Sequence, residues 1–401
     1  MNNFQLIEVK TASHIKLFHS LARDIYKNDP HWVQPLVSDI EHIFDPRHNQ
    51  LFTIGGGGQA VRWIVRDLST DKFVGRLAAF FNREKVALET LPTGGCGFFE
   101  SIDNPIVSRL MFDAAREWLA ARGIEAMDGP INFGDRMQWW GLLTEGFTEP
   151  LYAMPYARPY YAALFEDYGF LPYFNQITYL RPFYAGIELP APVKAKAERL
   201  AENPEYSFRT FDKKNKLKMA RDFCNIYNSG WAKIQGVKPL TEDSTLQMIR
   251  QMSPIIDPEV LMMAYHKDLA VGFFVILPDI NQIVKSFNGR FGLCEKLRLL
   301  YPIRTHKITR LSGLIFGVAA EYQGKGIEAG LIYQLEQYII KRKATSRVQY
   351  DNLQMGWIGD FNPVMIRMCE SYVRATRYKH HITYRYLFDR TLPFERCPRR
   401  G

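Results

Sequence analysis

The sequence predicts an α/β protein (α+β in some schemes) built from two duplicated halves. Short apolar or alternating segments, which indicate strands, are interleaved with amphipathic segments that indicate helices. A hairpin pattern recurs about 200 residues after its first appearance, and the ends of the two halves also resemble each other. A repeat of this length is typical of duplicated domains rather than of a solenoid.

The first hairpin is predicted from Val61–Val65, a polar turn at residues 70–72, and Phe73–Phe80. Its counterpart is Leu261–Tyr265, a turn at residues 267–268, and Ala270–Leu277. Both pairs of segments are rich in β-branched and aromatic residues on either side of a short polar turn.

The second repeat joins a helix to a strand. Residues 158–170 begin with Arg-Pro, carry Glu166 and lead to Ile177–Tyr179, whereas residues 362–372 begin with Asn-Pro, carry Glu370 and lead to Ile382–Tyr384. Between the halves, residues 187–192 form a Pro-rich segment typical of an extended linker. We therefore expect two domains, 1–189 and 190–401.

Composition sets broad limits on function. The 401 residues are 47% hydrophobic and 23% charged, which excludes a disordered or fibrous chain. The net charge is +9, but no helix-turn-helix, RRM or zinc-finger pattern accompanies it, so DNA is not an expected partner. The opening residues lack a secretory signal and the most apolar stretch is too short to span a bilayer, so we expect a cytoplasmic protein without stable membrane insertion.

Cysteine and histidine usage predicts neither a disulfide framework nor a metal site. The five cysteines are scattered without a CxxC pair, and the nine histidines include no HExxH. The adjacent His380 and His381 lie in a predicted strand, where neighbouring side chains point to opposite faces.

Residues 314–331 are the most informative segment. An apolar strand leads into Gly324-Lys325-Gly326 and then into a helix, in which residues 327, 331, 335 and 339 form one apolar stripe. The first amides of a helix have no internal partners and lie at the positive end of its dipole, so a pyrophosphate would fit there. A plain strand-to-helix turn explains the glycines equally well.

The stretch Val318–Ile327 resembles the acyl-CoA-binding segment of the GCN5-related N-acyltransferases, the GNAT superfamily, whose signature is Gln/Arg-x-x-Gly-x-Gly/Ala. Gln323 and Gly326 match the signature, while Glu328 stands where Gly or Ala is usual, and Ala329 and Gly330 are expected to restore the close approach. Residues 28–36, 129–132 and 141–147 are similar to segments of a large bacterial family of two-domain GNAT-like proteins. The resemblance implies tandem acyl-CoA N-acyltransferase (GNAT) folds with mixed central sheets flanked by helices.

The resemblance also implies a binding mode for acetyl-CoA or another acyl-CoA. The pyrophosphate would contact Gln323, Gly324, Lys325, Gly326 and Ile327, and the pantetheine arm would bond to the backbone of Phe316 and Val318 where two parallel strands splay apart. The corresponding junction in the first half, residues 98–105, has no glycine pair. We therefore expect a degenerate first half that does not hold the cofactor.

Three residues are candidates for catalysis. Glu321 is the first candidate for a general base, although a solvated turn carboxylate is the alternative. Asn362 would line the cleft, or simply begin a helix. Cys369 occupies the position at which the superfamily often has an acidic Tyr, so Tyr372 is the candidate substitute, and the apolar neighbours of Cys369 predict a buried structural thiol.

Two further regions have alternative interpretations. The aromatic residues 139–140, 156 and 160–161 form either an acceptor pocket or, as aromatics at helical spacing usually do, core. The basic, amphipathic residues 285–307 form a lid, a membrane-facing segment or a surface helical hairpin.

The expected function is that of an acyl-CoA-dependent N-acyltransferase, in particular an acetyltransferase, that acts on a small-molecule or other amine acceptor by direct attack. A non-catalytic acyl-CoA-binding or scaffolding protein and an aminoacyl-tRNA-dependent transferase are the alternatives.

Overall fold

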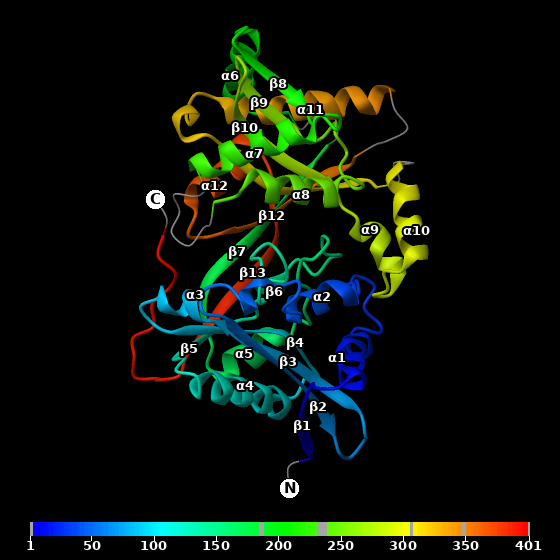
Figure 1. Cartoon of the computed structure of the whole chain (residues 1–401), viewed down its shortest axis with the longest axis vertical. Helices are drawn as coiled ribbons and strands as arrows, with labels where there is room; N and C mark the ends of the chain where they lie inside the picture. The colour runs from blue at the N-terminus through cyan, green and yellow to red at the C-terminus, as the bar shows by residue number, and fades with distance from the viewer. Residues whose placement is uncertain (1–2, 184–187, 231–238, 305–307, 346–349, 400–401) are drawn as a thin grey trace.

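The computed structural model describes residues 3–183, 188–230, 239–304, 308–345 and 350–399. A single thirteen-stranded mixed sheet runs through both halves of the chain, with helices on its two faces (Figure 1). The mixed α/β class predicted from the sequence is confirmed.

The strands are β1 (Phe4–Glu8), β2 (Gly58–Asp67), β3 (Phe73–Asn82), β4 (Thr93–Ser101), β5 (Ala126–Gly129), β6 (Leu142–Glu145), β7 (Leu171–Pro182), β8 (Tyr206–Thr210), β9 (Met262–His266), β10 (Leu269–Pro278), β11 (Arg310–Val318), β12 (Asn352–Gly359) and β13 (Thr376–Leu387). The α-helices are α1 (Ala12–Ile25), α2 (Val37–Phe44), α3 (Arg83–Ala87), α4 (Pro105–Ala120), α5 (Tyr161–Tyr168), α6 (Ala191–Glu202), α7 (Lys216–Gly230), α8 (Glu242–Met252), α9 (Asn281–Val284), α10 (Leu293–Arg304), α11 (Ile327–Thr345) and α12 (Pro363–Arg367). Short 3₁₀ turns cover Gln50–Phe52, Lys285–Phe287 and Ala320–Tyr322, and a π-helical turn covers Met368–Tyr372.

The two predicted hairpins are β2–β3 and β9–β10, and both form antiparallel pairs. Alternation along their inner strands sorts side chains onto the two faces of the sheet. In β10, for example, Phe274 and Ile276 join the core beneath α6 and α11, whereas Phe273 joins the core beneath α7 and α8. Both hairpin predictions are therefore confirmed.

The two halves exchange their last strands. The sheet order is β1-β2-β3-β4-β5-β13-β7-β12-β11-β10-β9-β8, so β13, from the end of the chain, pairs with β5, and β7, from the first half, pairs with β12. These two strands lie side by side at the centre of the molecule (Figure 1). Only β4–β5 and β11–β12 are parallel among the described strand pairs. The domain boundary near residue 190 stays a prediction, but neither half completes its own sheet.

The exchanged strands make matching contacts, as the repeat in the sequence suggests. The hydroxyl of Tyr179 on β7 donates to Glu370 Oε1 of the second half at 2.9 Å. Its repeat equivalent, Tyr384 on β13, donates to Glu166 Oε1 of the first half, also at 2.9 Å. The residues that recur in the sequence therefore form two equivalent Tyr–Glu hydrogen bonds, each joining one half to the other.

Burial follows the same crossed pattern. Tyr179 is fully buried in the core formed by α6, α11 and the second-half strands. Tyr384 is fully buried in the core formed by α4, α5 and the first-half strands. Each half therefore depends on a strand of the other for its hydrophobic core.

The aromatic residues of the first half serve its structure. Tyr161 is buried and donates to Glu100 Oε2 at 2.7 Å, and Tyr160 donates to the Ser101 carbonyl at 2.8 Å. Tyr156 bonds to Asp29, which also pairs with Arg158. These contacts favour the core interpretation over an acceptor pocket.

Candidate functional site

A gap opens between the parallel strands β11 and β12. Their pairing runs from Arg310–Asn352 to Gly313–Met355 and then stops, while β11 continues beside β10 and β12 continues beside β7. A bulge in β11 at Leu314 lies at the point of separation, since Val275 pairs with Ile315 and Ile276 pairs with Gly313. The splayed parallel strands implied by the resemblance are present.

The backbone of β11 faces this gap in the expected register. Ala319 donates its N–H to the Val271 carbonyl of β10. Because adjacent residues of a strand direct their N–H and C=O groups to opposite edges, the groups of Val318 and Phe316 point toward the gap. They can therefore extend a ladder to an inserted amide-containing chain.

The glycine turn lies where β11 passes into α11. Gly324 and Gly326 have φ angles of +75° and +95°, a region that residues with a side chain rarely adopt. A Cβ on Gly324 would meet no atom within 4 Å, so the outer side of the turn is open. The predicted apolar stripe is confirmed, since Ile327, Leu331, Leu335 and Ile339 are all buried.

Lys196, on α6, was not predicted from the sequence. Its ammonium lies 3.7 Å from Glu328 Oε1 and 3.4 Å from the Gly324 carbonyl oxygen, and its methylenes pack against Gly326. The carboxylate of Glu328, which departs from the GNAT signature, is therefore paired with a cation. This pairing offsets the repulsion that Glu328 would exert on a bound phosphate.

The expectation that Ala329 and Gly330 allow a close approach to phosphate is wrong. Ala329 is fully buried, and a Cβ on Gly330 would lie 2.1 Å from the ring of Phe208 on β8. Gly330 therefore allows α11 to pack closely on the sheet. Gly272 does the same at the first turn of the helix, where a Cβ would meet Ile327 at 2.8 Å.

Four contacts surround the turn in addition to those of Lys196. The Tyr322 hydroxyl lies 3.0 Å from His266 Nδ1, and His266 Nε2 lies 3.3 Å from Glu205. The Gln323 side chain donates to the Val318 carbonyl at 3.4 Å, and the Lys325 ammonium lies 4.7 Å from the centre of the Tyr322 ring. Lys325 is exposed.

The three predicted catalytic residues occupy different environments. Glu321 is exposed in the 3₁₀ turn after β11. Asn362 is the N-cap of α12, where its side chain accepts the Met365 N–H at 3.2 Å. Tyr372 ends the π-helical turn and packs, half-buried, against the second-half core. Their roles in catalysis stay predictions.

Cys369 is fully buried beside Met355, with its Sγ 3.8 Å from the Met355 sulfur. Burial raises the pKa of its thiol to about 12, and the neighbouring charge of Glu370 adds to the effect. The prediction of a buried structural thiol is confirmed.

A loop of the first half reaches the gap, which sequence reasoning did not reveal. Trp357 on β12 donates its indole N–H to the Arg136 carbonyl at 3.0 Å. The methyl of Met137 lies 3.6 Å from the position of a Cβ on Gly356. On the other side, burial and then the charge of Asp135 raise the pKa of Tyr227 on α7.

The matching gap between β4 and β5 is filled by the chain itself. Those strands pair only from Thr93–Ala126 to Gly95–Asp128, and Ile131 then donates its N–H to the Cys96 carbonyl. A Cβ on Gly97 would lie 1.6 Å from the Ile131 carbonyl oxygen, so no space is left between them. The N-cap of the helix that follows, α4, is Asn104, whose side chain accepts the Ile106 N–H. The absence of a cofactor from the first half stays a prediction.

Comparisons with known proteins agree with this architecture. No protein-family model matches the chain. Over 377 residues it is 27% identical to Protein YghO of Escherichia coli (strain K12), covering 92% of each chain. Over 394 residues it is 24% identical to a protein of Caulobacter vibrioides named bacterial ceramide synthase, covering 95% of this chain and 97% of that one.

Among solved structures, a tandem GNAT protein from the clavulanic acid biosynthesis pathway aligns with 98% of this chain and 100% of its own, at a TM-score of 0.52 and 12% identity. A GCN5-related glucosamine N-acetyltransferase region in a fungal multi-domain β-N-acetylglucosaminidase aligns with 96% of this chain at a TM-score of 0.53 and 12% identity. The alignment spans 38% of that fungal chain. The protein therefore has two GNAT-type halves joined in one sheet. Its fold is that of the tandem GNAT proteins, as the sequence predicted.

Proposed function

We propose that the protein is an acyl-CoA-dependent N-acyltransferase whose donor site is the gap between β11 and β12. The observation that carries this proposal is the continuity of the gap with the glycine turn. The edge of β11 at Phe316 and Val318 pairs with no strand on the gap side and leads directly to the start of α11. A thioester carrier has a chain with amides and a diphosphate at one end. The edge of β11 is complementary to the amides of such a carrier, and the start of α11 is complementary to its diphosphate.

The free amides at the start of α11 and the charge of Lys325 would hold the diphosphate, with Lys196 beside them. Phe316 and Val318 would pair with the pantetheine amides. The acceptor amine would attack the thioester carbon, the C–S bond would break, and the thiolate would take up a proton. A backbone N–H of the β11 bulge, next to the end of the strand pairing, is the candidate hydrogen-bond donor to the oxyanion of the tetrahedral intermediate.

The acceptor side of the gap is bounded by the loop of residues 134–139 and by α7. Asp135 and Tyr227 are two ionisable groups at this boundary that interact with each other, and Glu321 lies beyond the end of β11. We propose Glu321 as the base and Tyr372 as the acid, and we add Asp135 as a competing base. Glu321→Gln, Tyr372→Phe and Asp135→Asn separate these roles, because a base lost from the reaction lowers kcat without a matching loss of donor affinity.

The relative named bacterial ceramide synthase supports a lipid amine as the acceptor, since ceramides are N-acylated long-chain amino alcohols. The fungal glucosamine N-acetyltransferase region shares only the fold. We therefore propose long-chain amines as the first acceptor class to test and small amines as the second, with acetyl-CoA and long-chain acyl-CoA as donors.

Thermal unfolding with CoA, acetyl-CoA, a long-chain acyl-CoA and ATP tests the donor site. A ligand at about 100 times its Kd stabilises the native state by about 2.7 kcal/mol, or roughly 3 °C for a chain of this length. Lys325→Glu should reduce the CoA shift, whereas Lys16→Glu, an exposed lysine of α1, should leave it unchanged. No shift with any CoA species would refute the donor site.

A non-catalytic acyl-CoA-binding protein is the second candidate. Its support is Cys369, a buried thiol of raised pKa at the position where the superfamily often has a Tyr. Release of free CoA thiol, measured with a panel of amines, distinguishes the two. Stabilisation by CoA without thiol release from any acyl-CoA and amine pair would favour the binding protein.

A further inference from the structure

The segment between β10 and β11 carries an apolar stripe that is largely exposed. Leu293, Leu297 and Tyr301 of α10 are 75%, 62% and 62% exposed. They are spaced four residues apart and therefore share one face of the helix. The opposite side of α10 is anchored by the buried Leu299, which packs with Ile280, Val284 and Phe287. The helix therefore packs on the rest of the molecule through Leu299 and presents Leu293 and Leu297 outward.

A groove of about 630 Å³ lies along this stripe. Ile283, Leu297 and Tyr301 supply its apolar lining, and Lys285 and Arg298 stand at its edge. Lys285 is paired with Glu149 at 2.9 Å, whereas Arg298 donates to the Ser286 hydroxyl at 3.1 Å. Arg298 also lines a second hollow next to the groove.

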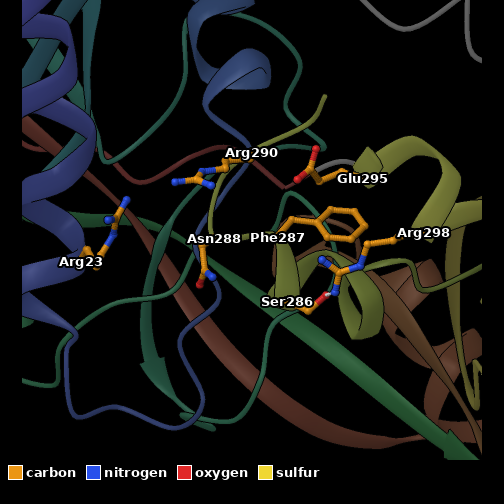
Figure 2. Close-up of a pocket in the computed structure, with 7 residues that line it drawn as sticks. All are labelled: Arg23, Ser286, Phe287, Asn288, Arg290, Glu295 and Arg298. Carbon is orange, nitrogen blue, oxygen red and sulfur yellow. Dashed lines mark hydrogen bonds between the residues drawn. The ribbon is translucent and has the colours of Figure 1, made fainter. Parts of the chain in front are cut away.

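That second hollow, of about 500 Å³, is cationic (Figure 2). Arg23 enters it from α1, while Arg290 and Arg298 come from the segment around α10 (Figure 2). Within the part of the chain that the structure describes, none of these three guanidinium groups pairs with a carboxylate. The carboxylate in the hollow, Glu295, accepts the Gly292 N–H at 2.8 Å.

We propose that this α10 face, made up of Leu293, Leu297, Tyr301, Arg23, Arg290 and Arg298, docks on the surface of an anionic lipid bilayer. Leucines exposed on a helix gain free energy by entering the acyl boundary, and arginines beside them bind anionic headgroups. The hollow takes the headgroup and the stripe enters the apolar layer. The proposed contact is peripheral, with α10 lying at the bilayer surface. Among the described helices, none is long and apolar enough to cross a bilayer.

Charge argues against the other occupants of this face. A second copy of the chain, related by a two-fold axis, would place the same arginines opposite one another. A neutral apolar peptide would cover the stripe but leave the cationic hollow without a counter-charge. An anionic bilayer matches both the stripe and the hollow.

Sedimentation of the full-length protein with vesicles tests the proposal, and no acyl donor is needed. Vesicles of phosphatidylcholine with about 30 mol% phosphatidylglycerol should bind the protein at about 0.15 M salt, whereas pure phosphatidylcholine should bind it at least about tenfold less. Leu293→Gln with Leu297→Gln should lower binding to the anionic vesicles at least about tenfold. Arg290→Glu with Arg298→Glu should do the same.

Matched controls exclude general effects on the fold or the charge. Leu88 and Leu269 are 62% and 55% exposed elsewhere on the molecule, and changing both to Gln should leave binding unchanged. Lys213→Glu with Lys214→Glu, two exposed lysines between β8 and α7, matches the charge change of the arginine pair and should also leave binding unchanged. The proposal is overturned if the wild type does not bind anionic vesicles, if it binds neutral vesicles equally, or if the α10 variants bind as the wild type does. It is also overturned if the leucine pair instead mediates dimerisation, seen by light scattering.

Discussion

The exchanged strands predict that a substitution in one half of the sequence loosens the other half. Tyr179 belongs to the first half but is fully buried in the second-half core, and Tyr384 shows the reverse arrangement. Replacing a buried aromatic residue by alanine costs about 3–5 kcal/mol, through lost burial and the cavity that remains. Tyr179→Ala and Tyr384→Ala form a matched pair, because each also loses one 2.9 Å hydrogen bond to a glutamate.

Hydrogen exchange with mass spectrometry reads out where the loss falls. A local loss of ~3 kcal/mol speeds exchange through opening by ~100-fold or more, since each 1.4 kcal/mol is a factor of ten. Tyr179→Ala should accelerate exchange in β11, β12 and α11 and weaken CoA binding. Tyr384→Ala should accelerate exchange in α4 and α5 instead.

The opposite distribution would refute the exchange. If Tyr179→Ala loosened α4 and α5 while β11 and α11 kept their protection, β7 would belong to the first-half core. Tyr179→Phe and Tyr384→Phe serve as mild controls, because they keep the ring and remove only the hydroxyl, at a cost of about 1–2 kcal/mol.

Three further predictions follow from buried groups. Arg310 forms ion pairs with Glu149 and with the fully buried Asp279. Arg310→Met leaves the Asp279 charge buried without its partner, so it should lower stability by about 3–5 kcal/mol, or roughly 4–6 °C in Tm. Adding Asp279→Asn should recover part of the loss, and an Arg310→Met variant as stable as the wild type would contradict the prediction. Burial lowers the pKa of His381 to about 3 from 6.5, so the unfolded state binds more protons than the native state between these pH values. The free energy of unfolding should therefore fall by at most ~5 kcal/mol as the pH drops through that window. His381→Gln should make the free energy from urea unfolding depend less on pH there, and an unchanged pH dependence would contradict the prediction. A thiol reagent at neutral pH should label the exposed Cys294 but not the buried Cys369, and equal labelling rates in the native protein would show that the buried site is open.

Local patterns predicted the parts of the structure that depend on nearby residues. The hairpins, the apolar stripe of α11 and the glycine turn each follow from side-chain periodicity or from glycine's access to positive φ. His380 and His381 also follow the period of two, since one is partly exposed and bonds to Thr144 while the other is buried.

Local patterns did not predict which strands lie beside β7 and β13. Alternation in β7 and β13 is the same whichever strand lies beside them, so periodicity does not indicate the exchange. The sequence nevertheless contains a signal for the exchange. Glu166 and Glu370 are separated by nearly the same number of residues as Tyr179 and Tyr384. Residues that recur together are candidates for contact with each other.

The site itself was predicted in part. The glycine turn and the separation of β11 from β12 are present, while their role in binding a cofactor stays a prediction. Lys196 comes from a helix about 130 positions earlier, and the loop carrying Asp135 and Met137 comes from the other half. Patterns among nearby residues do not indicate contacts between residues so far apart in the sequence. Gly330 was assigned to phosphate because it follows the motif, whereas its position on α11 turns it toward Phe208.

The most direct test of the proposed donor site is a crystal structure of the protein with CoA. The diphosphate should lie on the amides at the start of α11, near Lys325, with the pantetheine arm between β11 and β12 beside Phe316 and Val318. A gap that stays closed to the ligand at saturating CoA, with Lys196 and Glu328 covering the turn, would contradict the proposal.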